Sequence, residues 1–291
     1  MDQDRRIKAI HRLLKARDET RKESEGFSPD LSREMRSLFA DSFFGPDEIE
    51  SAFTVKDAQG KDVKLIELTP AERQEASRLL KEKLNEPDIK AFLLEMKKTP
   101  DELKNDWALT LRLTKFKDGT DITMKALREN PLILAKMKEI DPKQKGVIWT
   151  SDENWLKQQP CYTTHTPAFD PATNTFSMRW SLRTKELIPG PNDVDHAALT
   201  KELEKFSLGK RLGNAGSATG RKSAPAEDVF YLLERFLKTK EKGLVGKWAW
   251  SDVEGPVGYF VHVGRFGTDG VRVDRDHSVF HIGSLGVALS R

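Results

Sequence analysis

The fold is decided by Lys247-Trp-Ala-Trp250, Gly258-Tyr-Phe-Val-His-Val-Gly-Arg-Phe-Gly267 and Gly270-Val-Arg-Val-Asp-Arg-Asp-His277, followed by Ile282-Gly-Ser-Leu-Gly-Val-Ala-Leu-Ser-Arg291. Glycine and aromatic residues recur here at such short intervals that only short strands joined by tight turns fit the pattern. We therefore predict a small, multi-stranded β module over residues 244–291.

The chain before this module is predicted to be mostly helical. Residues 1–145 form a mainly helical scaffold region with one small hairpin at 53–68, where polar residues around Gly60 turn the chain. Residues 146–291 form an α+β region, in which a flexible linker at 208–224 precedes the C-terminal module. The predicted fold class is α+β: a mostly helical N-terminal region, then a mixed α/β region that ends in the small multi-stranded β module.

Several helices are predicted to begin at a capping residue followed by proline. Ser28-Pro29 and Thr69-Pro-Ala-Glu72 show this pattern, in which a side-chain oxygen accepts a hydrogen bond from a free backbone N–H. Pro225 opens the most regular helix, with apolar residues at helical spacing. A narrow apolar stripe also predicts a helix at 2–23.

Strict alternation of apolar and polar residues predicts two further strands. Leu109, Leu111 and Leu113 alternate with Thr110 and Arg112, and the same period recurs over residues 176–182. Such a strand ordinarily places one face on the core and the other in water. We therefore predict that the strand at 109–113 is half-buried.

The composition excludes several classes of function. With 49 basic and 46 acidic residues among 291, the net charge of +3 lacks the basic surface of a nucleic-acid-binding protein. No apolar run approaches the ~18 residues of a membrane span, and the first residues do not resemble a secretory signal. The single cysteine, Cys161, excludes a disulfide framework. We expect a soluble, cytoplasmic protein with no nucleic-acid and no membrane partner.

Two short motifs approach known catalytic patterns and miss them. Gly216 and Gly220-Arg-Lys-Ser223 differ from a phosphate-binding loop by an intruding arginine, and no predicted strand precedes them. Ile282-Gly-Ser284 places isoleucine where a nucleophile elbow requires glycine. Neither motif therefore indicates nucleotide binding or serine hydrolysis.

The C-terminal module contains side chains of the types that bind metals. These are His262, His277, His281, Asp269, Asp274 and Asp276. Their spacing matches no established metal-binding loop, and polar residues on exposed strand faces account for it more simply. We therefore predict no metal and no cofactor.

A set of uncharacterised bacterial proteins resembles this chain over about residues 109–291. The resemblance is carried by Trp180-Ser-Leu-Arg-Thr-Lys-Glu-Leu-Ile-Pro-Gly190, the helix at 225–239, Val263-Gly-Arg-Phe-Gly267 and Gly286-Val-Ala-Leu-Ser-Arg291. No established activity accompanies that set, so this resemblance implies no catalytic residues.

The C-terminal part also resembles a C-type-lectin-like module. The order of Trp248, Val263–Gly267, Val271-Arg-Val273 and Ile282-Gly283 is similar to the modules of formylglycine-generating enzymes and of diversity-generating-retroelement target proteins. This resemblance implies ligand display on the loops between Trp248 and Ile282. It does not imply formylglycine chemistry, because the cysteines for that chemistry are missing.

Aromatic, arginine and polar side chains of the C-terminal module are the candidate ligand-binding residues. They are Trp250, Tyr259, His262, Arg265, Phe266, Arg272 and Asp274. Aromatic rings supply stacking and arginine supplies bidentate hydrogen bonds at many interfaces. We predict a non-enzymatic protein that presents these residues to a protein or glycan ligand.

Two other functions also fit the sequence. A hydrolase or transferase would use Cys161 as nucleophile and His165 as base, in the loop at 157–175. Prolines on both sides of that pair argue against a helix that would align the two side chains. A structural or assembly protein would instead form a homo-oligomer through the helix at 2–23.

Overall fold

The fold is α+β, as the sequence predicts, with a mainly helical N-terminal part and most strands in the C-terminal part. A computed structural model of the chain describes residues 27–95, 100–164, 178–187, 221–222, 225–254, 258–277, 285–286 and 289–290. The helices are α2 (Pro29–Phe39), η2 (Ala40–Ser42), α3 (Pro46–Ala52), α4 (Pro70–Asn85), α5 (Pro87–Glu95), α6 (Pro100–Asp106), α7 (Met124–Glu129), α8 (Pro131–Ile140), α9 (Glu153–Gln158), α10 (Pro160–Thr163) and α13 (Pro225–Thr239). The strands are β1 (Phe43–Phe44), β2 (Thr54–Lys56), β3 (Asp62–Lys64), β4 (Trp107–Leu113), β5 (Ile148–Trp149), β6 (Met178–Thr184), β7 (Arg221–Lys222), β8 (Trp248–Glu254), β9 (Tyr259–Gly267), β10 (Gly270–His277), β11 (Leu285–Gly286) and β12 (Leu289–Ser290).

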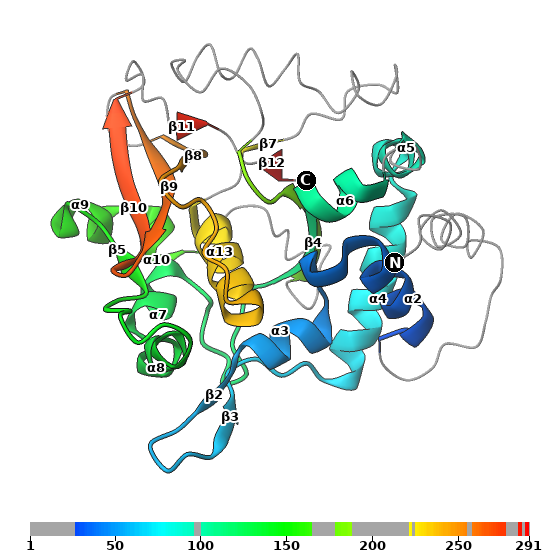
Figure 1. Ribbon diagram of the computed structural model, residues 1–291, viewed down its shortest axis with the longest axis horizontal. Coiled ribbons are helices and arrows are strands. Elements are labelled where there is room, and N and C mark those ends of the chain that lie inside the picture. The colour runs from blue at the N-terminus through cyan, green and yellow to red at the C-terminus, as the bar shows by residue number, and fades with distance from the viewer. Residues whose placement is uncertain are drawn as a thin grey trace.

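Two five-stranded sheets and the β2–β3 hairpin contain the strands of the described residues. The first sheet has the order β1-β4-β6-β12-β7, and the second has the order β11-β8-β9-β10-β5. Figure 1 shows α13 at the centre of the molecule, with β9 and β10 on one side of it and β4 on the other. One hydrophobic core includes residues of both sheets and of most helices.

Strand β4 is buried on both faces, which corrects the prediction of a half-buried strand. All seven residues of Trp107–Leu113 are buried. The polar face meets α13: Thr110 Oγ1 donates a hydrogen bond to Glu234 Oε2 at 2.9 Å, and Arg112 Nη1 donates to the carbonyl of Glu227 at 3.0 Å. The alternation therefore separates an apolar face from a polar face that lies inside the protein.

Helix α13 is buried along most of its length, and its two sides differ in chemistry. Towards the second sheet, Phe236 packs edge-on against Phe266, with ring centroids 5.1 Å apart. Towards the first sheet, Asp228 Oδ1 accepts a hydrogen bond from Arg183 at 2.6 Å, and the same guanidinium lies 4.0 Å from the Tyr231 ring centroid. Buried ion pairs add little net stability, but the loss of one partner is costly.

The first sheet joins the two regions that the sequence analysis separates at 145/146. Strands β1 and β4 come from residues 1–145, whereas β6, β12 and β7 come from residues 146–291. Strand β12 also leaves the predicted C-terminal module, since Ser290 pairs with Arg183 of β6. Within the described residues, the two regions therefore share one sheet and one core.

The predicted helix caps are present. Ser28 caps α2 through its hydroxyl, and Thr69 and Glu72 form a capping box at the start of α4. The predicted helix at 2–23 and most of the predicted linker at 208–224 lie outside the described residues. Among the helices that the structure describes, none combines the length and the apolar character needed to cross a bilayer.

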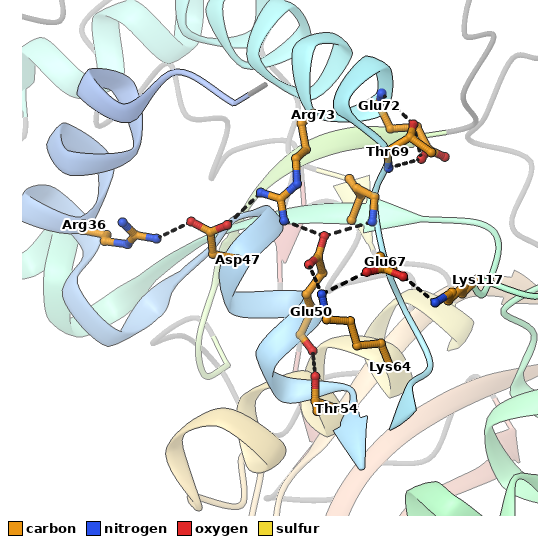
Figure 2. Close-up of polar contacts among 11 residues, drawn as sticks. Arg36, Asp47, Glu50, Thr54, Lys64, Glu67, Thr69, Glu72, Arg73 and Lys117 are labelled. Carbon is orange, nitrogen blue, oxygen red and sulfur yellow. Dashed lines mark hydrogen bonds and ion pairs between the residues drawn. The ribbon is translucent and has the colours of Figure 1, made fainter. Parts of the chain in front are cut away.

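A buried carboxylate, Glu50, links α3 to α4. Figure 2 shows Arg73 of α4 between Glu50 and Asp47; its Nη2 lies 2.6 Å from Glu50 Oε1, and its Nη1 lies 2.7 Å from Asp47 Oδ1. The backbone N–H of Leu68 donates to the same oxygen of Glu50 at 2.9 Å. Arg36 of α2 donates to Asp47 at 3.0 Å, so three helices are connected through two carboxylates.

Glu50→Ala is expected to lower the free energy of unfolding by about 2 to 3 kcal/mol, because a buried N–H and a guanidinium lose their shared acceptor. Glu67→Ala is the matched control, since Glu67 pairs with Lys64 and Lys117 at the surface. Its expected cost is about 0.5 kcal/mol or less. Urea unfolding followed by circular dichroism measures both values, and equal costs would contradict the role given to Glu50.

Candidate functional site

Side chains on one face of the second sheet fall into rows, because directly paired residues of neighbouring strands point the same way. The first row is Trp248 of β8, Gly264 of β9, Arg272 of β10 and Trp149 of β5. The second row is Trp250, His262 and Asp274, and the third is Phe260 and Asp276. We call these residues the tryptophan face. The sheet as a whole packs against α13.

Arg272 occupies the centre of the first row. Its guanidinium carbon lies 4.0 Å from the ring centroid of Trp149 and 5.3 Å from that of Trp248. Gly264, paired with Arg272 on β9, has no side chain to compete for this space. The Nε of Arg272 donates to Asp274 Oδ2 at 2.7 Å. Its Nη1 and Nη2 have no hydrogen-bond partner among the described residues, and its side chain is 32% exposed.

Asp274 anchors this arrangement to the segment that follows β5. Its Oδ1 accepts hydrogen bonds from Ser151 N at 2.9 Å, from Ser151 Oγ at 2.6 Å and from Thr150 Oγ1 at 3.2 Å. Its other oxygen holds Arg272, and the residue is buried. Several donors on one carboxylate fix its position and so fix the plane of the guanidinium.

His262 supports the tryptophan face as a neutral ring. Burial lowers the pKa of His262 to about 4, which the nearby Asp274 opposes and Arg272 reinforces. The ring lies edge-on to Trp248, with centroids 4.2 Å apart, and its Nε2 lies 3.2 Å from Asp276 Oδ2. Burial, followed by the charge of Asp274, raises the pKa of Asp276. At neutral pH the imidazole is therefore uncharged and packs as an aromatic group.

Three of the predicted site residues lie at the margin of this face or away from it. Arg265 is exposed, has a φ of 40°, and its guanidinium carbon lies 5.5 Å from the Trp248 ring centroid. Tyr259 is 38% exposed at the start of β9. Phe266 is buried against Phe236 of α13, so the structure does not place it on the tryptophan face.

The predicted residues also differ in how accessible they are. Trp250 and His262 are 0% and 2% exposed, so they are buried beneath the accessible residues of the site and support them. Arg272, Trp149, Phe260 and Asp276 are partly exposed on this face, and Arg265 is exposed at its margin. Trp149 was not predicted as a site residue, because the parallel pairing of β5 with β10 joins residues far apart in the chain.

The other candidate chemistries receive no support from the described geometry. Cys161 is buried in α10 within the hydrophobic core, and His165 lies outside the described residues, so their pairing stays a prediction. No group of three or more His, Cys, Asp or Glu side chains in the described part of the chain is placed to hold a metal ion. Of the metal-ligand types considered from the sequence, Asp269 pairs with Lys145, with Oδ1 and Nζ 3.7 Å apart, and His281 lies outside the described residues.

The chain matches no protein-family model, no curated protein and no solved structure. The two resemblances stated from the sequence therefore stay predictions. The function proposed below rests on the geometry of the tryptophan face.

Proposed function

We propose that the protein is a non-enzymatic binding protein whose C-terminal sheet recognises a carboxylate group of a protein or glycan ligand. The observation that carries this proposal is the state of Arg272, which is stacked on Trp149, held at Nε by Asp274, and without partners at Nη1 and Nη2 among the described residues. An arginine fixed in this way loses little side-chain entropy on binding, and its fork matches a carboxylate with two parallel hydrogen bonds.

Charges near Arg272 favour short-range recognition over long-range attraction. Arg265 brings a second cation to the Trp248 ring, while Asp274 and Asp276 bring two carboxylates to the same face. The local charge is therefore close to balanced, and affinity depends on the bidentate contact more than on the surrounding field. A hydrogen bond to a charged group contributes roughly 1.5 to 3 kcal/mol, or about 10- to 100-fold in affinity.

The proposal is tested with two ligand panels offered to the full chain. A glycan array compares neutral glycans with glycans that carry uronic or sialic acids, and a display library offers peptides with acidic residues and free carboxyl termini. We expect the enriched ligands to carry a carboxylate. Arg272→Lys is expected to weaken their binding about 10-fold and Arg272→Gln about 30-fold, because lysine cannot reproduce the stacked, bidentate geometry.

Arg33→Gln is the matched control, since Arg33 is an exposed arginine that pairs with Asp30, three positions earlier on the same helix, at 3.4 Å. Its binding is expected to equal that of the native protein, and thermal melting verifies that each variant is folded. The panel that supplies the carboxylate ligands distinguishes a protein partner from a glycan. Enrichment of neutral ligands, or equal binding by the native protein and Arg272→Gln, would overturn the proposal.

A further inference from the structure

A concave site lies beside the C-terminal half of α13, and no residue of the tryptophan face lines it. This cleft has a volume of about 390 Å³ and is bordered by η2, β1, α6, the residue that follows β6, and α13. Its size falls in the range of small-molecule sites. Lys185, which follows β6, is held in place because its backbone N–H donates to the carbonyl of Asp106 at 2.9 Å.

The cleft carries an excess of positive charge. Lys104, Lys185, Arg235 and Lys238 line it, against the carboxylates of only two lining residues, Asp41 and Glu241. The amines of Lys104 and Lys185 make no hydrogen bond or ion pair within the described residues. Lys238 donates to the carbonyls of Asp41 and Phe43, at 3.1 and 2.7 Å, and its Nζ lies 4.7 Å from the Phe44 ring centroid, so this charge is held in place at the cleft.

One residue that lines the same space has a buried hydroxyl. Tyr231 is 1% exposed and lines the cleft, and its hydroxyl has no hydrogen-bond partner in the described part of the chain. Burial raises the pKa of Tyr231 to about 12, so the hydroxyl keeps its proton and acts as a donor. A buried polar group without a partner is costly, and an acceptor in the cleft would satisfy this one.

The dipole of α13 offers a simpler account of some of these cations. The C-terminal end of a helix carries about half a negative charge, and Lys238 and Arg235 complement the charge at this end of α13. Lys104 and Lys185 come from other segments, and each brings a full charge. The two positive charges of Lys104 and Lys185 exceed the half negative charge at the end of α13. The helix dipole therefore does not account for all four cations of the cleft.

The lowered pKa values of two of these lysines agree with an anion-binding role for the cleft. Burial, together with the neighbouring Arg235, lowers the pKa of Lys185, and burial likewise lowers the pKa of Lys238. Both shifts record amines that are partly desolvated without a sufficient counter-charge. A dianion in the cleft would supply that charge.

We propose that this cleft binds the phosphate group of a small phosphorylated molecule, with Lys185, Lys104 and Lys238 as charge partners and the Tyr231 hydroxyl as a hydrogen-bond donor. Lysine binds phosphate as a point charge and needs no fixed plane, which suits cations that arrive from separate segments. The volume beyond a single phosphate would hold the organic part of the ligand.

Calorimetric titration of the full chain at constant ionic strength tests this proposal. The probes are glucose 6-phosphate and inorganic phosphate, with glucose as the neutral comparison. We expect saturable binding of the phosphate monoester with a dissociation constant below about 1 mM, and none of glucose. Tighter binding of the monoester than of inorganic phosphate would identify a phosphorylated metabolite as the ligand class, and equal binding would identify free phosphate.

Two variants and two controls assign the binding to the cleft. Lys185→Met is expected to weaken phosphate binding about 10-fold, and Tyr231→Phe about 5-fold, since phenylalanine keeps the ring under Arg183 and removes only the hydroxyl. Lys61→Met, in the exposed β2–β3 turn, should bind like the native protein. Arg272→Gln should also bind phosphate normally, which separates this site from the tryptophan face. Absence of saturable phosphate binding, or unchanged binding by Lys185→Met, would overturn the proposal.

Discussion

Gly270→Ala is expected to lower the free energy of unfolding by about 3 kcal/mol or more. Gly270 opens β10 with a φ of 111°, and a Cβ atom there would lie 2.4 Å from the carbonyl oxygen of Val147 and 2.8 Å from the nitrogen of Ile148. Both atoms belong to backbone that pairs with β10 through the Val271 N–H. The clash therefore cannot be relieved by rotating a side chain, and the β5–β10 pairing must shift.

Gly60→Ala separates the steric part of this effect from the conformational part. Gly60 also has a positive φ, of 78°, but a Cβ atom there would meet nothing within 4 Å. Its expected cost is about 1 kcal/mol, from backbone strain alone. Guanidinium unfolding followed by tryptophan fluorescence measures both variants, and equal costs would show that β5 adapts freely. Because β5 carries Trp149, Gly270→Ala should also weaken ligand binding through Arg272.

Native stability is expected to fall as the pH rises from 6.5 to 8, because of Glu234. Burial raises the pKa of Glu234 to about 8, from an ordinary value of 4.5, and the Thr110 hydrogen bond and the charge of Arg112 only partly oppose this. Between these values the folded protein holds a proton that the unfolded chain has released. Each pH unit in that range therefore removes roughly 1.4 kcal/mol of stability, and the loss ends above pH 8.

Below pH 6.5, His262 gives the free energy of unfolding the opposite dependence on pH. Its folded pKa of about 4 lies below the ordinary 6.5, so its contribution to stability grows as the pH rises from 4 to 6.5 and is then constant. Below pH 6.5 the two slopes offset one another. Above it, of these two groups, only Glu234 contributes a slope.

Glu234→Gln is expected to remove the decline between pH 6.5 and 8 and to make the protein more stable than native at pH 8, because the amide stays neutral. Glu139→Gln is the control, since Glu139 is an exposed carboxylate that pairs with Lys136 at 3.7 Å. It should leave the slope unchanged. Chemical unfolding at four pH values measures the slopes, and a native-like slope in Glu234→Gln would contradict the proton held by this residue.

Local signals in the sequence were sufficient to predict the helix starts and the β2–β3 hairpin. The cap at Thr69 and the turn at Gly60 depend only on neighbouring residues. The environment of β4 was not predictable in this way, because α13 covers Thr110 and Arg112 from more than a hundred positions away in the chain. Alternating apolar and polar residues are compatible with a strand whose polar face lies in water. They are equally compatible with a strand whose polar face packs against polar side chains of a helix.

In the candidate sites, too, local signals predicted some residues, whereas contacts between distant parts of the chain determined the others. His262, Arg272 and Asp274 entered the candidate set because they belong to one predicted module, and the pairing of β9 with β10 places His262 opposite Asp274 and Gly264 opposite Arg272. Trp149 joined them only through a parallel pairing with no short-range signal. The cleft beside α13 could not be predicted from the sequence for a related reason: no local pattern distinguishes Lys104 and Lys185 until folding brings their segments beside α13.

The composition of the first sheet bears on how this protein folds during its synthesis. Strands β4 and β6 emerge from the ribosome well before β12 and the helix α13 that cover and extend them. At ordinary elongation rates, the interval between Thr184 and Ser290 lasts roughly 5 to 20 seconds. For about the first half of that interval, until α13 is complete at Thr239, the nascent chain presents Arg112, Arg179 and Arg183 with no acidic helix to cover them. The edge of β6 has no β12 to pair with until the end of the interval. A chaperone that shields strand edges would therefore be expected to raise the folded yield most when it acts on the nascent chain before α13 is complete.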